Sequence, residues 1–210
     1  MARELIVAPD LAAAGAELFL ALEPRTVALA GGTTPRRLYE RLAAVPYPWS
    51  AVDVFFGDER CVPPDDPDAN LRMARQALLD AVPARVHAMT GCDPAAYEDE
   101  LAAVFGPDLP AFDLVFLGLG EDGHTASLFP GDSALDVTDR WVVTVDRPDH
   151  PRMTLTLPVL SAARVALFLV GGSSKRAALA RLLADGDVPA ARVEAARIVV
   201  LADPDAVGPG

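Results

Sequence analysis

The sequence predicts an α/β fold, in which a mostly parallel β-sheet is covered by helices on both faces. Short apolar runs rich in β-branched residues recur along the chain, and segments with helical spacing of apolar residues lie between many of them. The apolar runs, each predicted to be a strand, occupy 27–30, 52–56, 114–117, 141–145, 164–170 and 198–201. Strands that are apolar almost throughout are typical of a parallel sheet buried on both sides.

Five helices are predicted between or before these runs. The first begins after Asp10, whose carboxylate is a natural N-cap, and its apolar face runs from Leu11 to Leu22. The second takes Thr34 as its N-cap and Pro35 as part of its first turn. The other three are predicted at 69–81, 94–105 and 174–184.

The composition predicts a single domain over residues 1–210. Of the 210 residues, 51% are hydrophobic and 23% are charged, which is ordinary for a soluble globular protein. A chain of this length forms a sufficient core without a disulfide or a structural metal, so Cys61 and Cys92 are expected to be reduced thiols. The Pro- and Asp-rich stretch 62–68 is interpreted as a functional loop, because the composition is the same on both sides of it.

The charge and hydropathy of the chain indicate which partners it can bind and where in the cell it is located. The chain carries 18 Lys and Arg against 30 Asp and Glu, a net charge of -12, which excludes a nucleic acid as the main partner because its phosphates would be repelled. An anionic ligand must be held by a local group of cations and backbone N–H groups. Residues 1–8 lack a basic-then-apolar leader, and no apolar stretch is long enough to span a membrane. We therefore expect a cytoplasmic protein with no membrane contact.

Ligands of such sheets bind beyond the carboxyl ends of the strands, so the loops that follow the predicted strands are the candidate sites. The loop after 27–30 runs into the second helix and consists of Gly31, Gly32, Thr33 and Thr34. Paired glycines let a ligand approach the backbone, and the helix N-terminus behind them offers free N–H groups, which together predict a phosphate site. Taken alone, the turn fits an ordinary helix cap equally well.

A second glycine turn, Gly171-Gly172, follows the strand predicted at 164–170. It leads to Lys175, the only lysine in the chain, in the first turn of a predicted helix. The helix dipole disfavours a cation at that position unless an anion is bound nearby. Two turns of the same design at one edge of the sheet favour a phosphate ligand with Lys175 as its counter-charge over a solvated surface lysine.

A charged segment, Gly57-Asp58-Glu59-Arg60, directly follows the strand predicted at 52–56. An α/β fold places functional groups at strand ends, and a guanidinium such as that of Arg60 can bind an oxyanion through two hydrogen bonds. Asp58 and Arg60 are therefore candidate ligand-binding residues. The alternative is a surface salt-bridge cluster, which would be preferred if the other motifs were absent.

The loop after 114–117 matches a dinucleotide-binding pattern. Its three glycines with the G-x-G-x-x-G spacing are Gly118, Gly120 and Gly123. Asp146, at the end of the next predicted strand, lies where a ribose-binding acid is expected. Two acidic residues inside the loop would oppose a pyrophosphate, however, and a Pro-Gly pair at 130–131 prevents a long helix. An NAD(P)-dependent oxidoreductase is therefore the second hypothesis.

His124, in the same loop, is the candidate general base. It is one of three histidines, and it alone lies in a glycine-rich loop at a strand end. An imidazole ionises near neutral pH and can take a proton from water, and Asp122 two residues earlier can orient it. The sequence contains neither a G-x-S-x-G elbow nor H-E-x-x-H or a comparable ligand cluster, so no serine nucleophile and no catalytic metal are expected.

In this order along the chain, these motifs resemble those of the 6-phosphogluconolactonase family. The resemblance rests on GGTTP at 31–35, GDERCVP at 57–63 and GEDGHTASLFP at 120–130. Further matches are Asn70, RMTLTLP at 152–158 and the turn that carries Lys175. Ser161 stands where the family often has Asn, and residues 199–203 follow the family's usual ending only loosely.

The resemblance implies a modified Rossmann-like α/β sandwich, shared with glucosamine-6-phosphate deaminase. It implies hydrolysis of 6-phospho-D-glucono-1,5-lactone to 6-phospho-D-gluconate in the oxidative pentose phosphate pathway, without an organic cofactor. It further implies that His124 is the general base and that Arg60 and Lys175 bind the phosphate. The predicted catalytic residues are His124 and Asp122, and those predicted for the substrate and its phosphate are Gly31, Gly32, Thr33, Thr34, Asp58, Arg60, Gly123, Arg152 and Lys175.

Two further functions require sequence features that differ from those of a lactonase. A deaminase of this family needs a Glu shortly after the Asp-Gly-His segment, where this chain has Ser-Leu-Phe-Pro at 127–130. A non-catalytic sugar-phosphate sensor usually accompanies a basic DNA-binding segment, which the N-terminal part of this chain lacks. We therefore expect a lactonase whose partner is a small phosphosugar lactone. The sequence does not predict the oligomeric state.

Overall fold

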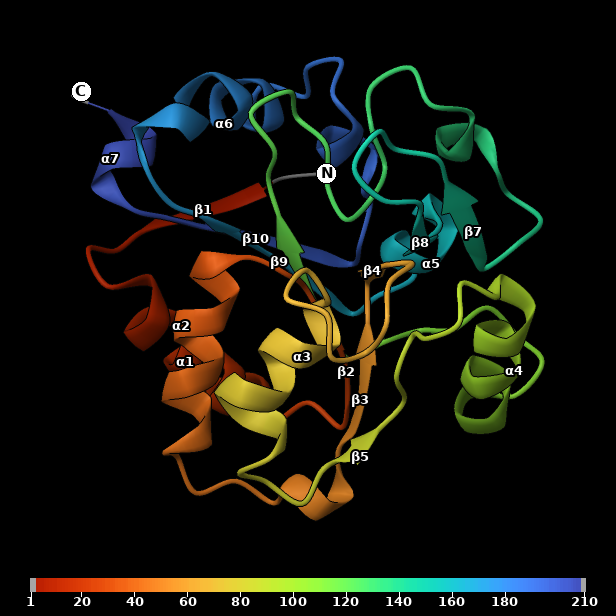
Figure 1. Ribbon diagram of the computed structural model, residues 1–210. Coiled ribbons are helices and arrows are strands. Elements are labelled where there is room, and N and C mark those ends of the chain that lie inside the picture. The colour runs from red at the N-terminus through yellow and green to blue at the C-terminus, as the bar shows by residue number, and fades with distance from the viewer. Residues whose placement is uncertain (1–2, 209–210) are drawn as a thin grey trace.

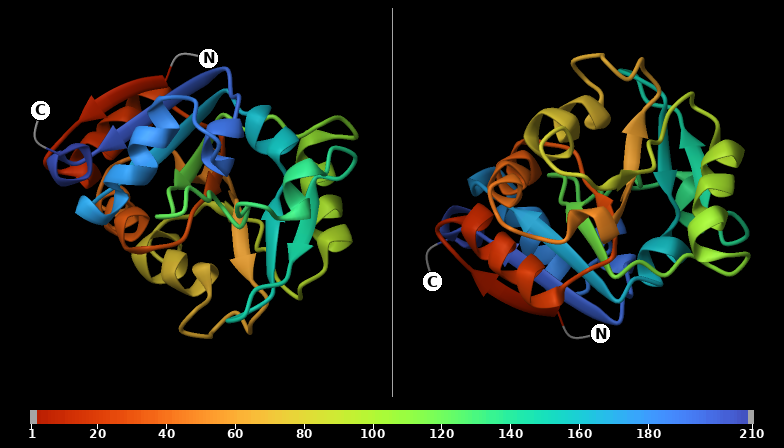
Figure 2. Two further views of the ribbon diagram at one scale, coloured as in Figure 1. Left: turned by 90° about the horizontal axis from the view of Figure 1, so that it is seen from above. Right: turned by 90° about the horizontal axis from the view of Figure 1, so that it is seen from below.

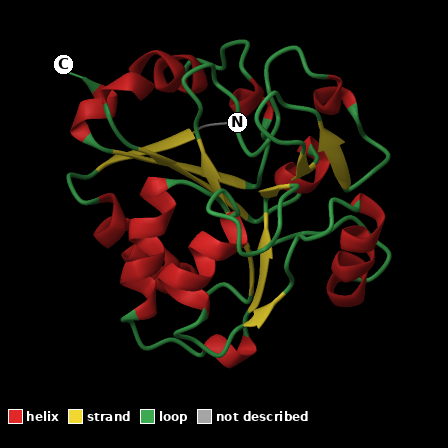
Figure 3. Cartoon of the chain, viewed as in Figure 1, coloured by secondary structure: helices red, strands yellow, loops and turns green. Residues whose placement is uncertain are grey.

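The computed structural model describes residues 3–208, which form two β-sheets surrounded by helices (Figure 1 and Figure 3). In this part of the chain the larger sheet has seven strands in the order β1-β10-β9-β6-β2-β3-β5, and every neighbouring pair is parallel. Its strands are β1 (Arg3–Val7), β2 (Thr26–Leu29), β3 (Asp53–Phe56), β5 (Arg85–Val86), β6 (Leu114–Gly118), β9 (Val165–Val170) and β10 (Arg197–Ala202). The predicted α/β fold with a mostly parallel sheet is confirmed.

The smaller sheet is antiparallel and was not predicted. It consists of β4 (Asp58–Arg60), β8 (Arg152–Leu155) and β7 (Val142–Val145), in that order. Five of the six predicted strands lie in the large sheet, but the run at 141–145 forms β7, so its assignment to the parallel sheet was wrong. Thr144 in β7 is exposed whereas Val142 and Val145 are buried. β7 is the edge strand of the small sheet and pairs antiparallel with β8.

Helices cover both faces of the large sheet, as predicted. They are α1 (Leu11–Leu22), α2 (Thr33–Ala43), α3 (Asn70–Ala74), α4 (Pro94–Phe105), α5 (Leu157–Ser161), α6 (Arg176–Leu183) and α7 (Pro204–Val207). Short 3-10 turns cover Trp49–Ala51, Ser133–Asp136, Ser173–Lys175 and Pro189–Arg192, and a π turn at Arg75–Leu79 continues α3. In Figure 1 and Figure 2, α1, α2 and α3 lie on one side of the large sheet, and α6 and α7 lie on the other. None of the described helices combines the length and the apolar character that crossing a membrane requires.

The N-terminal caps of the first two helices differ in kind. Asp10 caps α1 as predicted, since its carboxylate accepts a hydrogen bond from the Ala13 N–H at 2.9 Å. The predicted cap of the second helix was wrong, because α2 begins at Thr33 and Thr34 lies inside it. Its N-cap is Gly32, which has a φ of 106° and supplies no side-chain hydrogen bond. This left-handed backbone, which glycine adopts readily, turns the chain sharply from β2 into α2.

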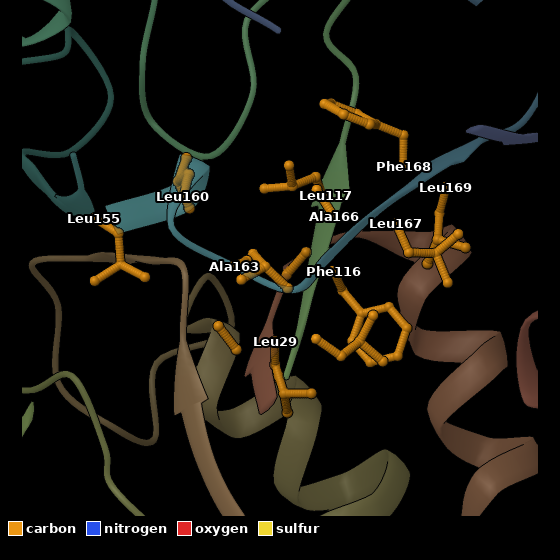
Figure 4. Packing of buried hydrophobic residues seen from close by; sticks show 14 of the residues in the cluster. Leu29, Phe116, Leu117, Leu155, Leu160, Ala163, Ala166, Leu167, Phe168 and Leu169 are labelled. Carbon is orange, nitrogen blue, oxygen red and sulfur yellow. The ribbon is translucent and has the colours of Figure 1, made fainter. Parts of the chain in front are cut away.

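The core is built on the two central strands of the large sheet, β6 and β9. Leu117 of β6 is paired with Phe168 of β9, and Phe116 is paired with Leu167. Figure 4 shows the first pair pointing to one face of the sheet and the second pair to the other. All four side chains are buried, so the carboxyl ends of these strands are held in a rigid frame.

Cys61 and Cys92 form a disulfide, which corrects the prediction of two reduced thiols. The fold brings the residue after β4 next to the residue before the N-cap of α4, with a Cα–Cα distance of 5.0 Å. The two residues are 31 positions apart, and no local spacing motif signals their contact. Disulfides are uncommon in cytoplasmic proteins, so the cytoplasmic location stays a prediction that this pairing does not favour.

We expect protein purified without reductant to show no free thiol after denaturation, and two per chain after reduction, when titrated with a thiol reagent. Because the disulfide closes a loop of 31 residues, Cys92→Ser should lower the free energy of unfolding by about 3 to 4 kcal/mol in the chain-entropy treatment. Urea unfolding of the oxidised wild type and of the variant measures this difference. Two reactive thiols in the unreduced wild type would contradict the pairing.

Candidate active site

A cavity of about 680 Å³ lies at the carboxyl ends of β9, β6, β2 and β3, which are neighbours in the large sheet. Its walls are the loops that follow these strands, together with part of the small sheet. The predicted site residues that line it are Gly31, Gly32, Thr33, Thr34, Asp58, Arg60, Asp122, His124, Arg152 and Lys175. The structure thus gathers in one cavity residues that are as far apart as 31 and 175 in the sequence.

Gly123 is the one predicted site residue that does not line the cavity. Its backbone has a φ of 92°, its carbonyl accepts a hydrogen bond from the Ala190 N–H at 3.0 Å, and it packs against Val188. Gly123 therefore shapes the loop and fixes it to the segment before β10. Its predicted role in ligand binding stays a prediction, and the contacts of this residue favour a role in loop geometry.

His124 and Asp122 form a pair on the wall of the cavity. The Asp122 Oδ1 atom lies 2.6 Å from the His124 Nδ1 atom and also accepts the backbone N–H of His124 at 3.0 Å. A carboxylate at this distance holds the proton on Nδ1 and leaves the lone pair on Nε2 as the basic site of the ring. Partial burial raises the pKa of Asp122, but the hydrogen bonds from His124 outweigh it and the pKa is lowered. The pair therefore contains an ionised carboxylate at neutral pH.

The surroundings of this pair fix the position of the imidazole. A Cβ atom at Gly120 would overlap both the His124 ring and the Asp122 carboxylate, so only glycine fits there. The His124 ring also packs against the Phe129 ring, with 4.4 Å between their centroids. The guanidinium of Arg147 lies 3.9 Å from the centroid of the same Phe129 ring. No sequence pattern indicates these roles of Phe129 and Arg147, because a contact between two loops leaves no local pattern.

Two arginines face the cavity from the small sheet. Arg60 of β4 and Arg152 of β8 are directly paired across the antiparallel strands, and both line the cavity. Arg60 donates to the backbone carbonyl of Asp68, and Arg152 donates to Asp149 at 2.5 Å, a bond that lowers the pKa of Asp149 to about 2. The Nε atoms of both arginines are buried and have no partner among residues 3–208. Two guanidinium groups on one cavity wall are suited to an anion with several acceptor oxygens.

The two glycine turns are less alike than their sequences indicate. In the second turn the Asp203 carboxylate already accepts the N–H of Gly172, at 2.8 Å. That turn therefore contributes the side chain of Lys175, which makes no ion pair with any described residue. In the first turn no acidic side chain occupies the start of α2, so the N–H groups of Thr33 and Thr34 are available to a ligand.

Asp58, on the cavity wall, and Glu59, next to it in the sequence, are buried carboxylates with separate partners. Asp58 accepts the Ser127 hydroxyl at 2.7 Å. Glu59 accepts the backbone N–H groups of Asn70 and Leu71, each at 2.7 Å, and so caps α3 from outside the helix. Burial raises the pKa of Glu59 despite these bonds. The sequence predicts a role for Asp58, but it contains no pattern that indicates these contacts of Glu59 or Ser127.

The structure lacks the context that a dinucleotide site requires. Residues 119–132, which follow β6, contain no helix whose N-terminus could bind a pyrophosphate. Asp146 follows β7 and therefore lies beside the small sheet, away from the strand next to β6. The glycine pattern at 118–123 instead serves the His124–Asp122 pair.

Comparisons with known proteins agree with this geometry. Residues 7–201 match the family model described as glucosamine-6-phosphate isomerases/6-phosphogluconolactonase. A 6-phosphogluconolactonase of Synechocystis sp. is 48% identical over 171 residues, which cover 76% of this chain and 71% of that protein. One from Streptomyces coelicolor is 40% identical over 182 residues, or 75% of this chain and 70% of that protein.

Solved structures of 6-phosphogluconolactonases are also similar to this chain. A 6-phosphogluconolactonase from Trypanosoma brucei is 31% identical and superposes with a TM-score of 0.85 over 97% of both chains. A monomeric glucosamine-6-phosphate deaminase, at 21% identity and a TM-score of 0.81 over 98% of both chains, shares the fold. By its sequence, its two sheets and its cavity, the chain belongs to the glucosamine-6-phosphate isomerase/6-phosphogluconolactonase family.

Proposed function

We propose that the protein hydrolyses 6-phospho-D-glucono-1,5-lactone to 6-phospho-D-gluconate, a step of the oxidative pentose phosphate pathway. The observation that carries the proposal is that a carboxylate-oriented imidazole and three cationic side chains share one cavity. His124 and Asp122 form the pair, and Arg60, Arg152 and Lys175 are the cations. The relatives named 6-phosphogluconolactonase support the choice of substrate.

His124 acts as the general base. Its Nε2 atom takes a proton from a water molecule, whose oxygen attacks the lactone carbonyl carbon. Asp122 keeps the proton on Nδ1 and stabilises the imidazolium that forms. The tetrahedral intermediate then breaks its bond to the ring oxygen, and the imidazolium returns the proton to that leaving oxygen. The step balances without a covalent intermediate or an organic cofactor.

The carbonyl oxygen becomes negatively charged in the intermediate and needs hydrogen-bond donors. Within the loop after β6, the N–H groups of Gly120 and Gly123 are already bonded to carbonyls of the same loop. We therefore assign this role to the backbone N–H groups at the start of α2, in the turn 31–34. The side chains of Arg60, Arg152 and Lys175 hold the phosphate, which orients the carbonyl toward His124.

Two alternatives make different demands on the cavity. Ring-opening deamination needs a carboxylic acid shortly after the Asp-Gly-His segment, and this chain has Ser127 there, buried and bonded to Asp58. A non-catalytic sugar-phosphate binding domain would have no need of the fixed His124–Asp122 pair. Turnover of the lactone, measured with the spontaneous rate subtracted, distinguishes hydrolysis from binding alone.

We expect His124→Ala to lower kcat by about 10²- to 10⁴-fold, the usual contribution of a general base, while KM changes little. The assay generates the lactone in situ and follows 6-phosphogluconate with its dehydrogenase. His87→Gln is the matched control, because His87 contacts Asp53 and Glu100 outside the cavity. A folded His124→Ala variant with the kcat of the wild type would contradict the assignment.

The lowered pKa of Asp122 makes the stability of the folded protein depend on pH. Because the native carboxyl ionises below its usual pKa, the stabilisation from its bonds to His124 is complete above that usual value. It is lost as the pH falls through the lowered native pKa. Asp122→Asn should remove this acid-dependent part of the stability and should lower kcat by about tenfold or more.

We expect Gly120→Ala to lower kcat nearly as much as His124→Ala, because the new methyl group would overlap the His124 ring and the Asp122 carboxylate. Gly118→Ala, at the end of β6, is the matched control. A Cβ atom at Gly118 meets no atom within 4 Å, so the pair is left in place. In the same coupled assay, the kcat values of the wild type and of Gly118→Ala should both be well above that of Gly120→Ala. Equal kcat values for the two glycine variants would show that the pair tolerates displacement.

We expect Lys175→Ala and Arg60→Ala mainly to raise KM, by about 10- to 100-fold, because each removes a charged hydrogen-bond donor to the phosphate. Arg197→Ala is the control. Arg197 is the first residue of β10 and pairs with Glu4, so it lies at the amino end of the strand, whereas the cavity lies at the carboxyl ends. Inorganic phosphate should inhibit the wild type more strongly than either cavity variant. An unchanged KM in both variants would remove the phosphate assignment but leave the lactonase activity in place.

A further inference from the structure

Asn70 is a buried polar residue on the cavity wall to which the mechanism above gives no role. It is the first residue of α3, it is 3% exposed, and it lines the cavity between the Gly31 turn and Asp58. Its backbone N–H is bonded to the Glu59 carboxylate at 2.7 Å. Because Glu59 holds the start of α3 in place, the backbone position from which the Asn70 side chain extends is fixed.

The orientation of the Asn70 amide is determined by its neighbours. Its Nδ2 atom donates to the backbone carbonyl of Asp58 at 2.9 Å and lies 3.4 Å from the Asp58 Oδ1 atom. Both neighbours are acceptors, so the NH₂ group must face Asp58 and the Oδ1 atom must face the other way. On that side is Gly31, where a Cβ atom would overlap the Asn70 Oδ1 atom. Gly31 therefore makes room for this oxygen.

The Asn70 Oδ1 atom receives no hydrogen bond from residues 3–208, although the donors of the same side chain are used. An acceptor held at a cavity wall without a donor is unfavourable until a ligand or water supplies one. The neighbouring Asp58 carboxylate is also an acceptor, so an anionic group is disfavoured at this place. A hydroxyl group, which donates and carries no charge, fits both neighbours.

We infer that the Asn70 Oδ1 atom accepts a hydrogen bond from a ring hydroxyl of the phosphosugar lactone, and that Asn70 is thereby a specificity-determining residue. The inference rests on the proposed function and deepens it. Arg60, Arg152 and Lys175 hold the anionic end of the substrate, and Asn70 with Asp58 recognises its neutral ring. The two contacts together fix which face of the lactone carbonyl meets His124.

The experiment compares the parent lactone with its 2-deoxy, 3-deoxy and 4-deoxy analogues, each followed by proton release with the spontaneous rate subtracted. In the wild type we expect at least one analogue to have a kcat/KM about tenfold below that of the parent, the size of one net hydrogen bond. In Asn70→Ala the parent should fall by about tenfold, and its advantage over that analogue should disappear. A residue that only supports the fold would lower all four values by the same factor.

Asn70→Asp is the comparison variant: it keeps an acceptor oxygen beside Gly31, but it replaces the NH₂ group that faces Asp58 with a carboxylate oxygen and adds a negative charge there. It should be slower on every lactone but should keep the preference for the parent. Where Asn70→Ala does not fold, Gly31→Ala replaces it, because the new methyl group displaces the same oxygen. A loss of preference in that variant would support the inference.

The outcomes separate the two proposals. If the wild type discriminates among the lactones and Asn70→Ala discriminates equally, or if the wild type does not discriminate at all, the role of Asn70 is overturned and the lactonase function stands. If the wild type does not accelerate hydrolysis of the parent lactone, the proposed function is overturned and this inference falls with it.

Discussion

The chain passes from the parallel sheet to the antiparallel sheet at Gly57, and the geometry of the cavity depends on this joint. The Gly57 N–H donates to the Leu29 carbonyl of β2 at 2.8 Å, and the Gly57 carbonyl accepts the Leu155 N–H of β8 at 2.8 Å. The backbone of Gly57 is therefore hydrogen-bonded to both sheets. A movement of one sheet relative to the other would break one of these two bonds. The residues directly after Gly57 are thus held over the carboxyl edge of the large sheet.

The three charged residues after this joint point to different neighbours, and each connects the joint to another loop. Asp58 binds the Ser127 hydroxyl in the loop that also carries His124, Glu59 caps α3, and Arg60 enters the cavity. Buried carboxylates are stable only with such partners, so Asp58 and Glu59 couple the loops rather than merely occupy space between them. A change in one of these loops is expected to reach the others through this network.

The sequence predicted the features that depend on local pattern and missed those that depend on contacts distant in the chain. Five buried strands, the Asp10 cap and α4 at Pro94–Phe105 follow from apolar runs and capping chemistry, and are confirmed. β4 and β8 are short and rich in polar residues, so no periodicity identifies them. Most of the residues that line the cavity belong to the sequence motifs identified above. The bond between Asp203 and Gly172, however, joins segments 31 residues apart, and no spacing rule predicts it.

The charge distribution also bears on release of the product. The chain has a net charge of -12, yet Arg60, Arg152 and Lys175 gather in one cavity, so capture of a phosphate depends on short-range bonds and not on long-range attraction. Hydrolysis of a lactone creates a new carboxylate and adds one negative charge to the ligand. In the proposed mechanism, that charge appears at the carbonyl attacked by the water that His124 activates, close to the ionised Asp122. The Asp122 carboxylate does not repel the neutral ring of the substrate, but it repels the new carboxylate of the product. This repulsion promotes dissociation of the product.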